Sequence, residues 1–163
     1  MSFLIKSDTA CWSDFPPAPL VRGRADVLLD FALEAMRAGA RRVYLVFCDD
    51  VVVEVDEIKA RSARELALEL LNKRRYRGSL KDVVEAWRGP VFYLHERGVD
   101  IDRADIGPGS LVVVGDQDGL SRDDEEYLRT KATWVSLGPA PYLSWFCAPY
   151  VMFKIKRSSS KRA

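Results

Sequence analysis

Short apolar runs that alternate with amphipathic segments constrain the fold more than any other feature of this sequence. Five runs have the β-branched and aromatic content of strands: residues 2–6, 41–48, 91–95, 111–115 and 133–137. Between the first two runs, Val27, Leu28, Phe31 and Ala35 recur at helical spacing. Strands that alternate with helices predict an α/β fold, with a mostly parallel sheet and helices on both faces.

Capping and turn residues predict where the connecting elements begin and end. Residues 7–22 contain three prolines and are expected to form a long loop. VVVEV at 51–55 follows an Asp-Asp turn and is expected to return as the second strand of a hairpin. The expected helices run from about Ala25 to Ala38, from Ser62 to Gly78, from Ser79 to Trp87, from Ser121 to Arg129 and from about Pro141 to Lys156.

Length and charge predict one domain with a basic tail. The 163 residues fit a single core, which we expect to span 1–156, with 157–163 as a basic tail. Net charge is only +1, but basic residues cluster at 73–77 and at 154–163. Each cluster fits either a solvated surface or contact with RNA phosphates.

Several classes of protein are disfavoured. No apolar run reaches the roughly 18 residues of a membrane span, and the N-terminal apolar segment is too short for a secretory signal, so a cytoplasmic location is expected. Cys11, Cys48 and Cys147 form no CxxC pair, which argues against both a disulfide scaffold and a zinc site. With His95 as the single histidine, no metal site is expected. Walker A, GxGxxG and GxSxG motifs are absent.

Three strand ends are candidates for a ligand site, because ligands of open α/β sheets bind beyond the carboxyl ends of strands. The strands at 91–95, 111–115 and 133–137 each run into a polar or glycine-rich turn. Gly115, Gly119 and Gly138 in these turns fit either close approach to a ligand or simple tight turns.

Two C-terminal motifs resemble a known family. GDQDGLSRDDEEYL at 115–128 and SLGPAPYLSWFC at 136–147 are similar to the SPOUT-class RNA methyltransferases, and most similar to the archaeal tRNA pseudouridine-54 N1-methyltransferases. The FLIK strand, the long loop, GRADVLL at 23–29 and VFYLHERGVDID at 91–102 agree more loosely. The resemblance implies S-adenosyl-L-methionine (SAM) as cofactor, RNA as partner, a C-terminal trefoil knot and a homodimer. The apolar segment 141–156 is expected to be covered by the dimer partner or by its own subunit.

The resemblance also implies which residues meet the cofactor and the substrate. The cofactor would contact Leu94, Gly115, Leu137, Gly138, Tyr142, Leu143 and Cys147. Gln117 stands where the family usually has histidine, and Trp145 and Phe146 stand in place of a Ser-His pair. Because of these departures, the resemblance does not determine which RNA nucleotide is the substrate.

Candidate catalytic residues each have a plainer alternative. Arg24 fits phosphate binding or a surface cation, and Asp26 fits proton acceptance or a helix first turn. Asp116 fits a role at the substrate or a turn cap, and His95 fits a structural role better than a catalytic one. Trp12 and Phe15 in the long loop fit base stacking or attachment of the loop to the core.

Three hypotheses follow from the sequence. The first is a methyltransferase acting on N1 of a tRNA pseudouridine. The second is a methyltransferase of this class acting on ribosomal RNA or on another tRNA position. The third is an inactive paralogue that binds SAM or RNA.

Overall fold

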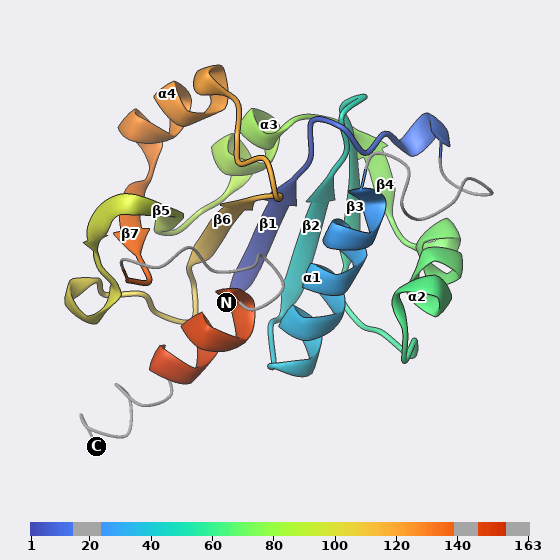
Figure 1. The fold of residues 1–163 in the computed structure, drawn as a ribbon, viewed down its shortest axis with the longest axis horizontal. Helices are drawn as coiled ribbons and strands as arrows, with labels where there is room; N and C mark the ends of the chain where they lie inside the picture. Colours follow the sequence, from blue (N-terminus) through green and yellow to red (C-terminus); the bar gives the residue numbers. More distant parts are fainter. Residues whose placement is uncertain (15–23, 139–146, 156–163) are drawn as a thin grey trace.

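Seven strands in a single sheet organise the described part of the chain. The computed structural model describes residues 1–14, 24–138 and 147–155. Within these ranges the strands are Ser2–Lys6 (β1), Arg42–Val46 (β2), Val51–Val55 (β3), Arg75–Arg77 (β4), Val91–Asp100 (β5), Leu111–Gly115 (β6) and Thr133–Ser136 (β7). They lie in the order β4-β3-β2-β1-β6-β5-β7 (Figure 1).

Most of the strand pairs are parallel, as predicted. β1 pairs in parallel with β2 and β6, and β5 pairs in parallel with β6 and β7. β2 and β3 form the expected antiparallel hairpin, and β4 extends it at one edge of the sheet. The order places β1 in the middle, so that β6, β5 and β7 form one half of the sheet.

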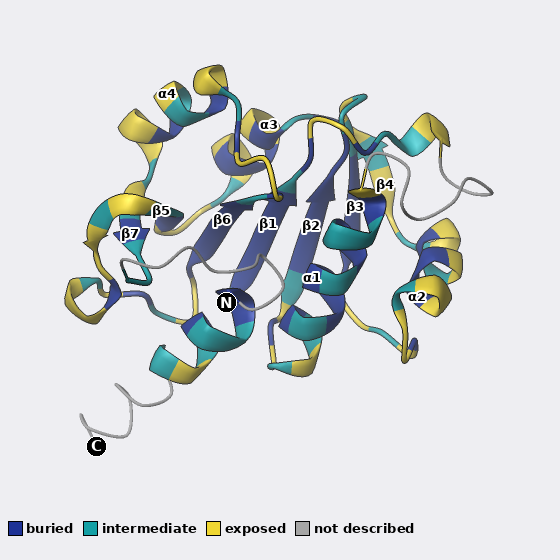
Figure 2. Cartoon of the chain, in the orientation of Figure 1, coloured by how far each residue is buried: buried dark blue, intermediate teal, exposed yellow. Residues whose placement is uncertain are grey.

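Helices cover both faces of this sheet, which confirms the predicted α/β class. The α-helices are Ala25–Arg37 (α1), Ala63–Glu69 (α2), Leu80–Ala86 (α3) and Arg122–Lys131 (α4), and 3-10 turns occur at Trp12–Asp14, Leu70–Asn72 and Ile101–Arg103. Residues 147–155 are also helical. α1, α2 and this last helix pack on one face together with Phe3 and Ile5. α3 and α4 pack on the other face with Leu4, which points the opposite way because side chains alternate along a strand (Figures 1 and 2).

A largely buried ion pair links the centre of the sheet to α4. Lys6 ends β1, and its ammonium group contacts the carboxylate of Asp124 in the first turn of α4 and lies 3.5 Å from Asp8. Burial lowers the pKa of Lys6, but the two carboxylates outweigh burial, and the net pKa is raised. Lys6 therefore remains a cation whose charge is matched by its neighbours.

The segment expected to be helical up to Gly78 is helical only in part. α2 ends at Glu69, and Arg75–Arg77 instead forms β4, with Val53 opposite Arg75 and Val51 opposite Arg77. This pairing gives hydrogen-bond partners to backbone groups of β3. The helical spacing of the leucines does not indicate that β3 needs such a partner. The predicted single helix is therefore wrong. Arg75 and Arg77 are exposed, and such charges on an edge strand oppose pairing with another chain.

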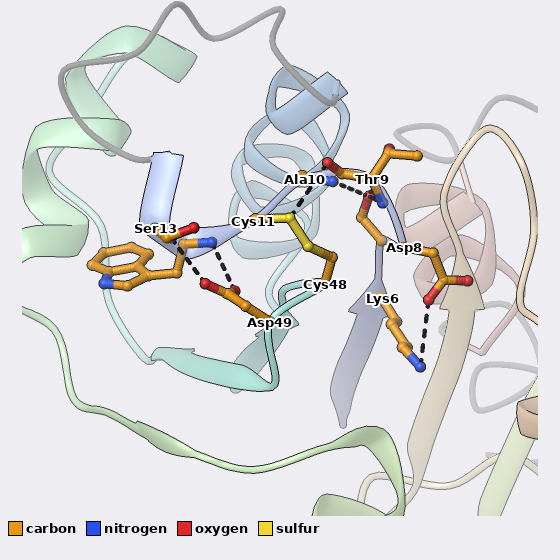
Figure 3. The surroundings of a disulfide bond; sticks show 10 residues. Lys6, Asp8, Thr9, Ala10, Cys11, Ser13, Cys48 and Asp49 are labelled. Carbon is orange, nitrogen blue, oxygen red and sulfur yellow. Dashed lines mark hydrogen bonds and ion pairs between the residues drawn. A yellow bond between two sulfur atoms is a disulfide. The ribbon is translucent and has the colours of Figure 1, made fainter.

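A disulfide corrects the expectation drawn from the cysteine count. Cys11, in the loop after β1, is bonded to Cys48 in the turn between β2 and β3, across 37 residues of chain (Figure 3). Their Cα atoms lie 4.8 Å apart, and the Cys48 amide donates to the Ala10 carbonyl over 2.8 Å. The fold brings β1 and β2 side by side, which juxtaposes two cysteines whose spacing along the sequence carries no such signal.

The start of the long loop is held against the same hairpin. The backbone amides of Trp12 and Ser13 each donate to the carboxylate of Asp49 over 2.9 Å (Figure 3). The Trp12 ring packs edge-on against Phe47 at 5.4 Å, and the Arg75 guanidinium lies 5.1 Å from its centroid. Trp12 thus attaches the loop to the core, the second of its two predicted roles. Phe15 lies outside the described residues.

The described part of the C-terminal helix packs against its own subunit. Cys147, Ala148 and Val151 are buried in the core that contains α1, whereas Phe153 is 59% exposed. The rest of the apolar segment, including Trp145 and Phe146, lies outside the described residues. No helix within the described ranges is long and apolar enough to span a bilayer.

Candidate active site

A pocket of about 380 Å3 lies against β5, β6 and β7. Its described lining comes from the three predicted strand ends, from α4 and from the C-terminal helix: Tyr93, Leu94, His95, Glu96, Val114, Gly115, Asp116, Asp118, Gly119, Leu120, Glu125, Ser136, Leu137, Gly138 and Cys147. These segments are far apart in sequence, and the strand order β6-β5-β7 makes them neighbours (Figure 1). The three candidate strand ends therefore line the same pocket.

The pocket opens where β5 separates from β6. The register of the two strands runs from Val91 opposite Leu111 to Tyr93 opposite Val113. Beyond this point β6 continues beside β1, where Lys6 lies opposite Gly115. β5 does not end at His95, as expected, but continues to Asp100. Its pairing with β7 shifts register between Leu94 and Val99, which both lie opposite Val135. This break in the pairing exposes backbone and side chains of both strands to the pocket.

Gly115 is required by the close approach of its own loop. A Cβ atom at this position would lie 2.7 Å from the carbonyl carbon of Gly119 and 2.8 Å from the amide nitrogen of Leu120. The turn closes with a hydrogen bond of 3.0 Å from the Gly119 amide to the Asp116 carbonyl. Any larger residue would push the turn, and Leu120 with it, out of position.

Ser136 and Gly138 shape the opposite wall. The Ser136 hydroxyl lies 3.2 Å from both the amide and the carbonyl oxygen of Gly138. Gly138 has a φ of 134°, which side-chain-bearing residues rarely adopt. The backbone at Leu137 and Gly138 is therefore held in a tight local turn beside the pocket.

Asp116 is the most buried acid in the pocket. It is 6% exposed, and its Oδ1 accepts the Asp118 amide over 3.0 Å. Its Oδ2 is buried and has no hydrogen-bond partner among the described residues. Burial raises the pKa of Asp116, while the nearby Ser7 hydroxyl and the Asp118 amide act in the opposite direction. The carboxylate is thus a stronger base than an ordinary aspartate.

A second polar group in the pocket joins β5 to α4. The Tyr93 hydroxyl lies 3.5 Å from Glu125 Oε1, and His95 Nε2 lies 3.9 Å from Glu125 Oε2. His95 Nδ1 accepts the Arg97 amide over 3.1 Å, so the neutral ring carries its proton on Nε2, facing Glu125. Burial, followed by the charge of Glu125, raises the pKa of Tyr93, which keeps the phenol protonated.

Most of the residues predicted for the cofactor meet at this pocket. Leu94, Gly115, Leu137, Gly138 and Cys147 all line it, as does the predicted catalytic residue Asp116. Tyr142 and Leu143 lie outside the described residues. Burial raises the pKa of Cys147 to about 11, so at neutral pH this residue is an apolar thiol rather than a nucleophile.

Arg24 and Asp26 do not line the pocket. They flank the start of α1, where Arg24 Nε lies 3.1 Å from Asp26 Oδ1 and a second nitrogen lies 3.3 Å from Oδ2. Arg24 has a φ of 61°, an uncommon value for a side-chain-bearing residue. The Arg24 side chain is 55% exposed, so this ion pair is open to solvent at the N-terminus of α1.

Glu125, Ser136 and Asp118 also line the pocket, although no sequence pattern singled them out. His95 lines it as well, and its role stays a prediction. Glu125 lies in an acidic first turn that reads as an ordinary helix start. Glu125 is recognised as a pocket residue only by its position on α4 opposite β5, and this position is known only from the tertiary structure. Gln117 is exposed, donates to Asp118 over 3.3 Å and is not part of the described lining.

The pocket has the composition of a site for a nucleoside-type cofactor. Leu94, Val114, Leu120 and Leu137 supply apolar surface, and the glycine turns leave backbone groups accessible at close range. Carboxylates supply sites for polar and cationic parts of a ligand. No group of three or more His, Cys, Asp or Glu side chains suited to a metal ion occurs in the described ranges.

Comparison with known proteins identifies relatives of this chain. No protein-family model matches it. A tRNA (pseudouridine(54)-N(1))-methyltransferase of Pyrobaculum aerophilum is 41% identical over 137 residues, which is 84% of this chain and 99% of the relative.

Solved structures share the fold at low sequence identity. Archaeoglobus fulgidus Nep1 bound to S-adenosylhomocysteine superposes with a TM-score of 0.67 at 17% identity, covering 98% of this chain and 99% of that one. The SpoU methyltransferase AviRb from Streptomyces viridochromogenes in complex with AdoMet gives 0.63 at 14% identity, covering 99% and 61%. Because the Pyrobaculum relative matches along nearly its whole length, the chain belongs to the tRNA (pseudouridine(54)-N(1))-methyltransferase family.

Proposed function

We propose that this protein transfers a methyl group from SAM to N1 of a pseudouridine in tRNA, at position 54. The 41% identity with the Pyrobaculum aerophilum enzyme over 137 residues carries the proposal. The pocket supports it, because the described residues expected to meet the cofactor line one cavity.

The chain's own residues fit the cofactor. Backbone groups at Gly115, Leu137 and Gly138 would hold the adenosine, with Leu94 and Leu120 as apolar surface on its base. When bound, SAM supplies an electrophilic methyl group on a sulfonium. Alignment of the acceptor with this methyl group and exclusion of water are the main tasks left to the protein.

Asp116 would accept the proton that N1 of pseudouridine loses. Its Oδ2 is unpartnered among the described residues, and burial makes the carboxylate more basic. Proton acceptance by Asp116 leaves a lone pair on N1 for the methyl carbon. Arg24, with Asp26 holding its guanidinium, would bind a phosphate of the RNA from the start of α1.

The assembly and cellular setting follow from the same proposal. We infer a single domain spanning 1–156 with a basic tail, a C-terminal knot, and a homodimer that covers Phe153, which is 59% exposed in the single subunit. A tRNA substrate implies action in the cytoplasm. Disulfides in that compartment are common chiefly in hyperthermophiles, which fits Cys11–Cys48.

Incubation with SAM and tRNA tests the reaction. We expect methylated pseudouridine, detected by mass analysis of the nucleosides, with tRNA that carries pseudouridine at position 54 and not with the same tRNA carrying uridine. Methylation of ribosomal RNA or of another tRNA position instead would contradict the substrate. SAM binding without any turnover would contradict the activity itself.

A further inference from the structure

The pocket is strongly acidic. Four carboxylates line it, from Glu96, Asp116, Asp118 and Glu125, whereas no lysine or arginine is among its described lining residues. His95 is the one basic side chain in that lining. Negative charge is therefore in excess among the described residues that line the pocket.

We propose that this acidic pocket discriminates its cofactor by charge, binding the sulfonium SAM more tightly than the neutral thioether S-adenosylhomocysteine. The inference rests on the proposed function. SAM carries one more positive charge than the product, and methyl transfer removes that charge as the electrons of the carbon–sulfur bond pass to sulfur. Methyl transfer would thereby lower the affinity of the pocket for the cofactor, because the product S-adenosylhomocysteine lacks the sulfonium charge.

In the part of the chain that the structure describes, no lysine or arginine forms an ion pair with these four carboxylates. Lys6, next to Gly115 in the sheet, is engaged by Asp124 and Asp8 and does not line the pocket. Arg97 contributes its backbone amide to His95. The Arg129 guanidinium lies over the Trp134 ring at 5.4 Å. A cationic ligand is thus the complement that this charge distribution favours.

Two of the carboxylates are positioned to act on a ligand. Asp116 Oδ2 is buried with no hydrogen-bond partner among the described residues, an arrangement that a ligand cation or donor would relieve. Glu125 lies between Tyr93 and His95, with its Oε1 3.5 Å from the Tyr93 hydroxyl and its Oε2 3.9 Å from His95 Nε2, and neither contact involves a lysine or an arginine. An opposite charge within about 4–6 Å of such groups changes an equilibrium by roughly tenfold or more.

Calorimetry on the full chain tests the proposal. The ligands are SAM, S-adenosylhomocysteine and an analogue with a protonated amine in place of the sulfonium, each at low and at high salt. We expect SAM and the amine analogue to bind about tenfold more tightly than S-adenosylhomocysteine, and the gap to narrow at high salt. Equal affinity of SAM and S-adenosylhomocysteine would overturn the inference.

Variants assign the effect to the pocket. Glu125→Gln and, separately, Glu96→Gln at the exposed rim should weaken SAM several-fold and leave S-adenosylhomocysteine unchanged. Glu126→Gln is the matched control, because Glu126 neighbours Glu125 on α4 but is exposed, pairs with Arg122 at 3.6 Å and does not line the pocket. Equal weakening of both ligands by both pocket variants would show that the carboxylates serve structure, and would overturn the inference.

Failure of the proposed function has a different signature. If the folded protein binds none of the three ligands, the cofactor assignment falls, and the charge inference falls with it. If all three bind with equal affinity, the cofactor assignment stands and only the charge inference fails. Thermal melting of each variant separates loss of binding from loss of folding.

Discussion

At the scale of single residues, the pocket depends on Asp116 and Gly115, which similar residues cannot replace without a change in chemistry or in backbone position. Asp116 combines 6% exposure with an unpartnered oxygen, and Gly115 sits where a Cβ atom would lie 2.7 Å from neighbouring backbone. Both are costly or restrictive arrangements for a folded chain, and both occur at the same pocket wall. Their cost to the fold supports a functional reading of that wall.

Asp116→Asn is expected to separate activity from stability. Burial raises the carboxyl pKa above its unfolded value, so ionisation of Asp116 costs stability as pH rises through the folded pKa. Asparagine keeps an acceptor for the Asp118 amide, so the free energy of unfolding at pH 7 should change by no more than about 1 kcal/mol. Methylation should fall at least about 100-fold because no base remains.

The pH profile provides the second measurement on this variant. In the wild type, methylation should decline as pH falls through the raised pKa of Asp116, at a pH above that of an ordinary aspartate. The residual activity of Asp116→Asn should lack this acid limb. An unchanged limb in the variant would assign the titration to another group.

Gly115→Ala is expected to abolish tight SAM binding. The added methyl group meets backbone of Gly119 and Leu120 that cannot rotate away, so the turn must shift by a few tenths of an ångström or more. Overpacking of this kind costs about 1–3 kcal/mol in unfolding free energy. Calorimetry with SAM measures the first effect, and denaturant unfolding measures the second.

Gly107→Ala is the control for this prediction. A Cβ atom at Gly107 has no heavy atom within 4 Å, so SAM affinity and stability should stay at wild-type levels. Wild-type SAM affinity in Gly115→Ala would mean that the turn between Gly115 and Leu120 does not shape the cofactor site.

At the scale of elements, the segment after β1 is attached to the β2–β3 hairpin by three kinds of contact. The first two are the Cys11–Cys48 bond and the two amide hydrogen bonds to Asp49 (Figure 3). The third is the packing of the Trp12 ring on Phe47. This attachment fixes the first part of the loop that leads to Arg24 and α1.

Removal of the disulfide is expected to lower thermal stability without unfolding the sheet. Closing a loop across 37 residues contributes about 3–4 kcal/mol in the chain-entropy view, or a fall in Tm of about 10 °C for a domain of this size. Thermal melts with and without reductant measure the change. The double variant Cys11→Ser/Cys48→Ser should match the reduced wild type and be insensitive to reductant; equal Tm for oxidised and reduced wild type would contradict the prediction.

At the scale of the whole molecule, we predict that the exposed face of the C-terminal helix contacts a second subunit. Phe153 is 59% exposed, although Val151 beside it is fully buried in the subunit core. Exposed aromatic residues next to a packed core are typical of interfaces. The proposed homodimer would cover this side chain.

Phe153→Glu is expected to weaken the dimer while the subunit stays folded. A carboxylate at this position cannot be buried against a partner without a charge penalty of several kcal/mol, whereas in the free subunit it faces solvent. Sedimentation equilibrium should show a shift toward monomer. Leu68→Glu on α2, where the leucine is 61% exposed, is the control and should leave the assembly unchanged; a wild type that is itself monomeric would refute the dimer.

Local pattern alone determined most of the architecture. Burial of one face of a strand or helix makes apolar residues recur at the period of that element. Apolar runs and helical periodicity therefore predicted most elements at nearly their observed bounds: β1, β2, β3, β6, β7, α1, α3 and α4. The glycine-rich strand ends also predicted where a ligand would bind, and Leu94, Gly115, Leu137, Gly138 and Cys147 do line one pocket.

Contacts between distant segments were decided only by the tertiary structure. β4 took the place of a predicted helix because β3 offered an edge to pair with, and Cys11 met Cys48 because β1 and β2 are neighbours. The acidic character of the pocket also arises in this way, since Glu125 reaches β5 only when α4 packs on the sheet. Such pairings depend on which elements become neighbours in space, and a hydrophobic period along the chain carries no information about a partner in a distant segment.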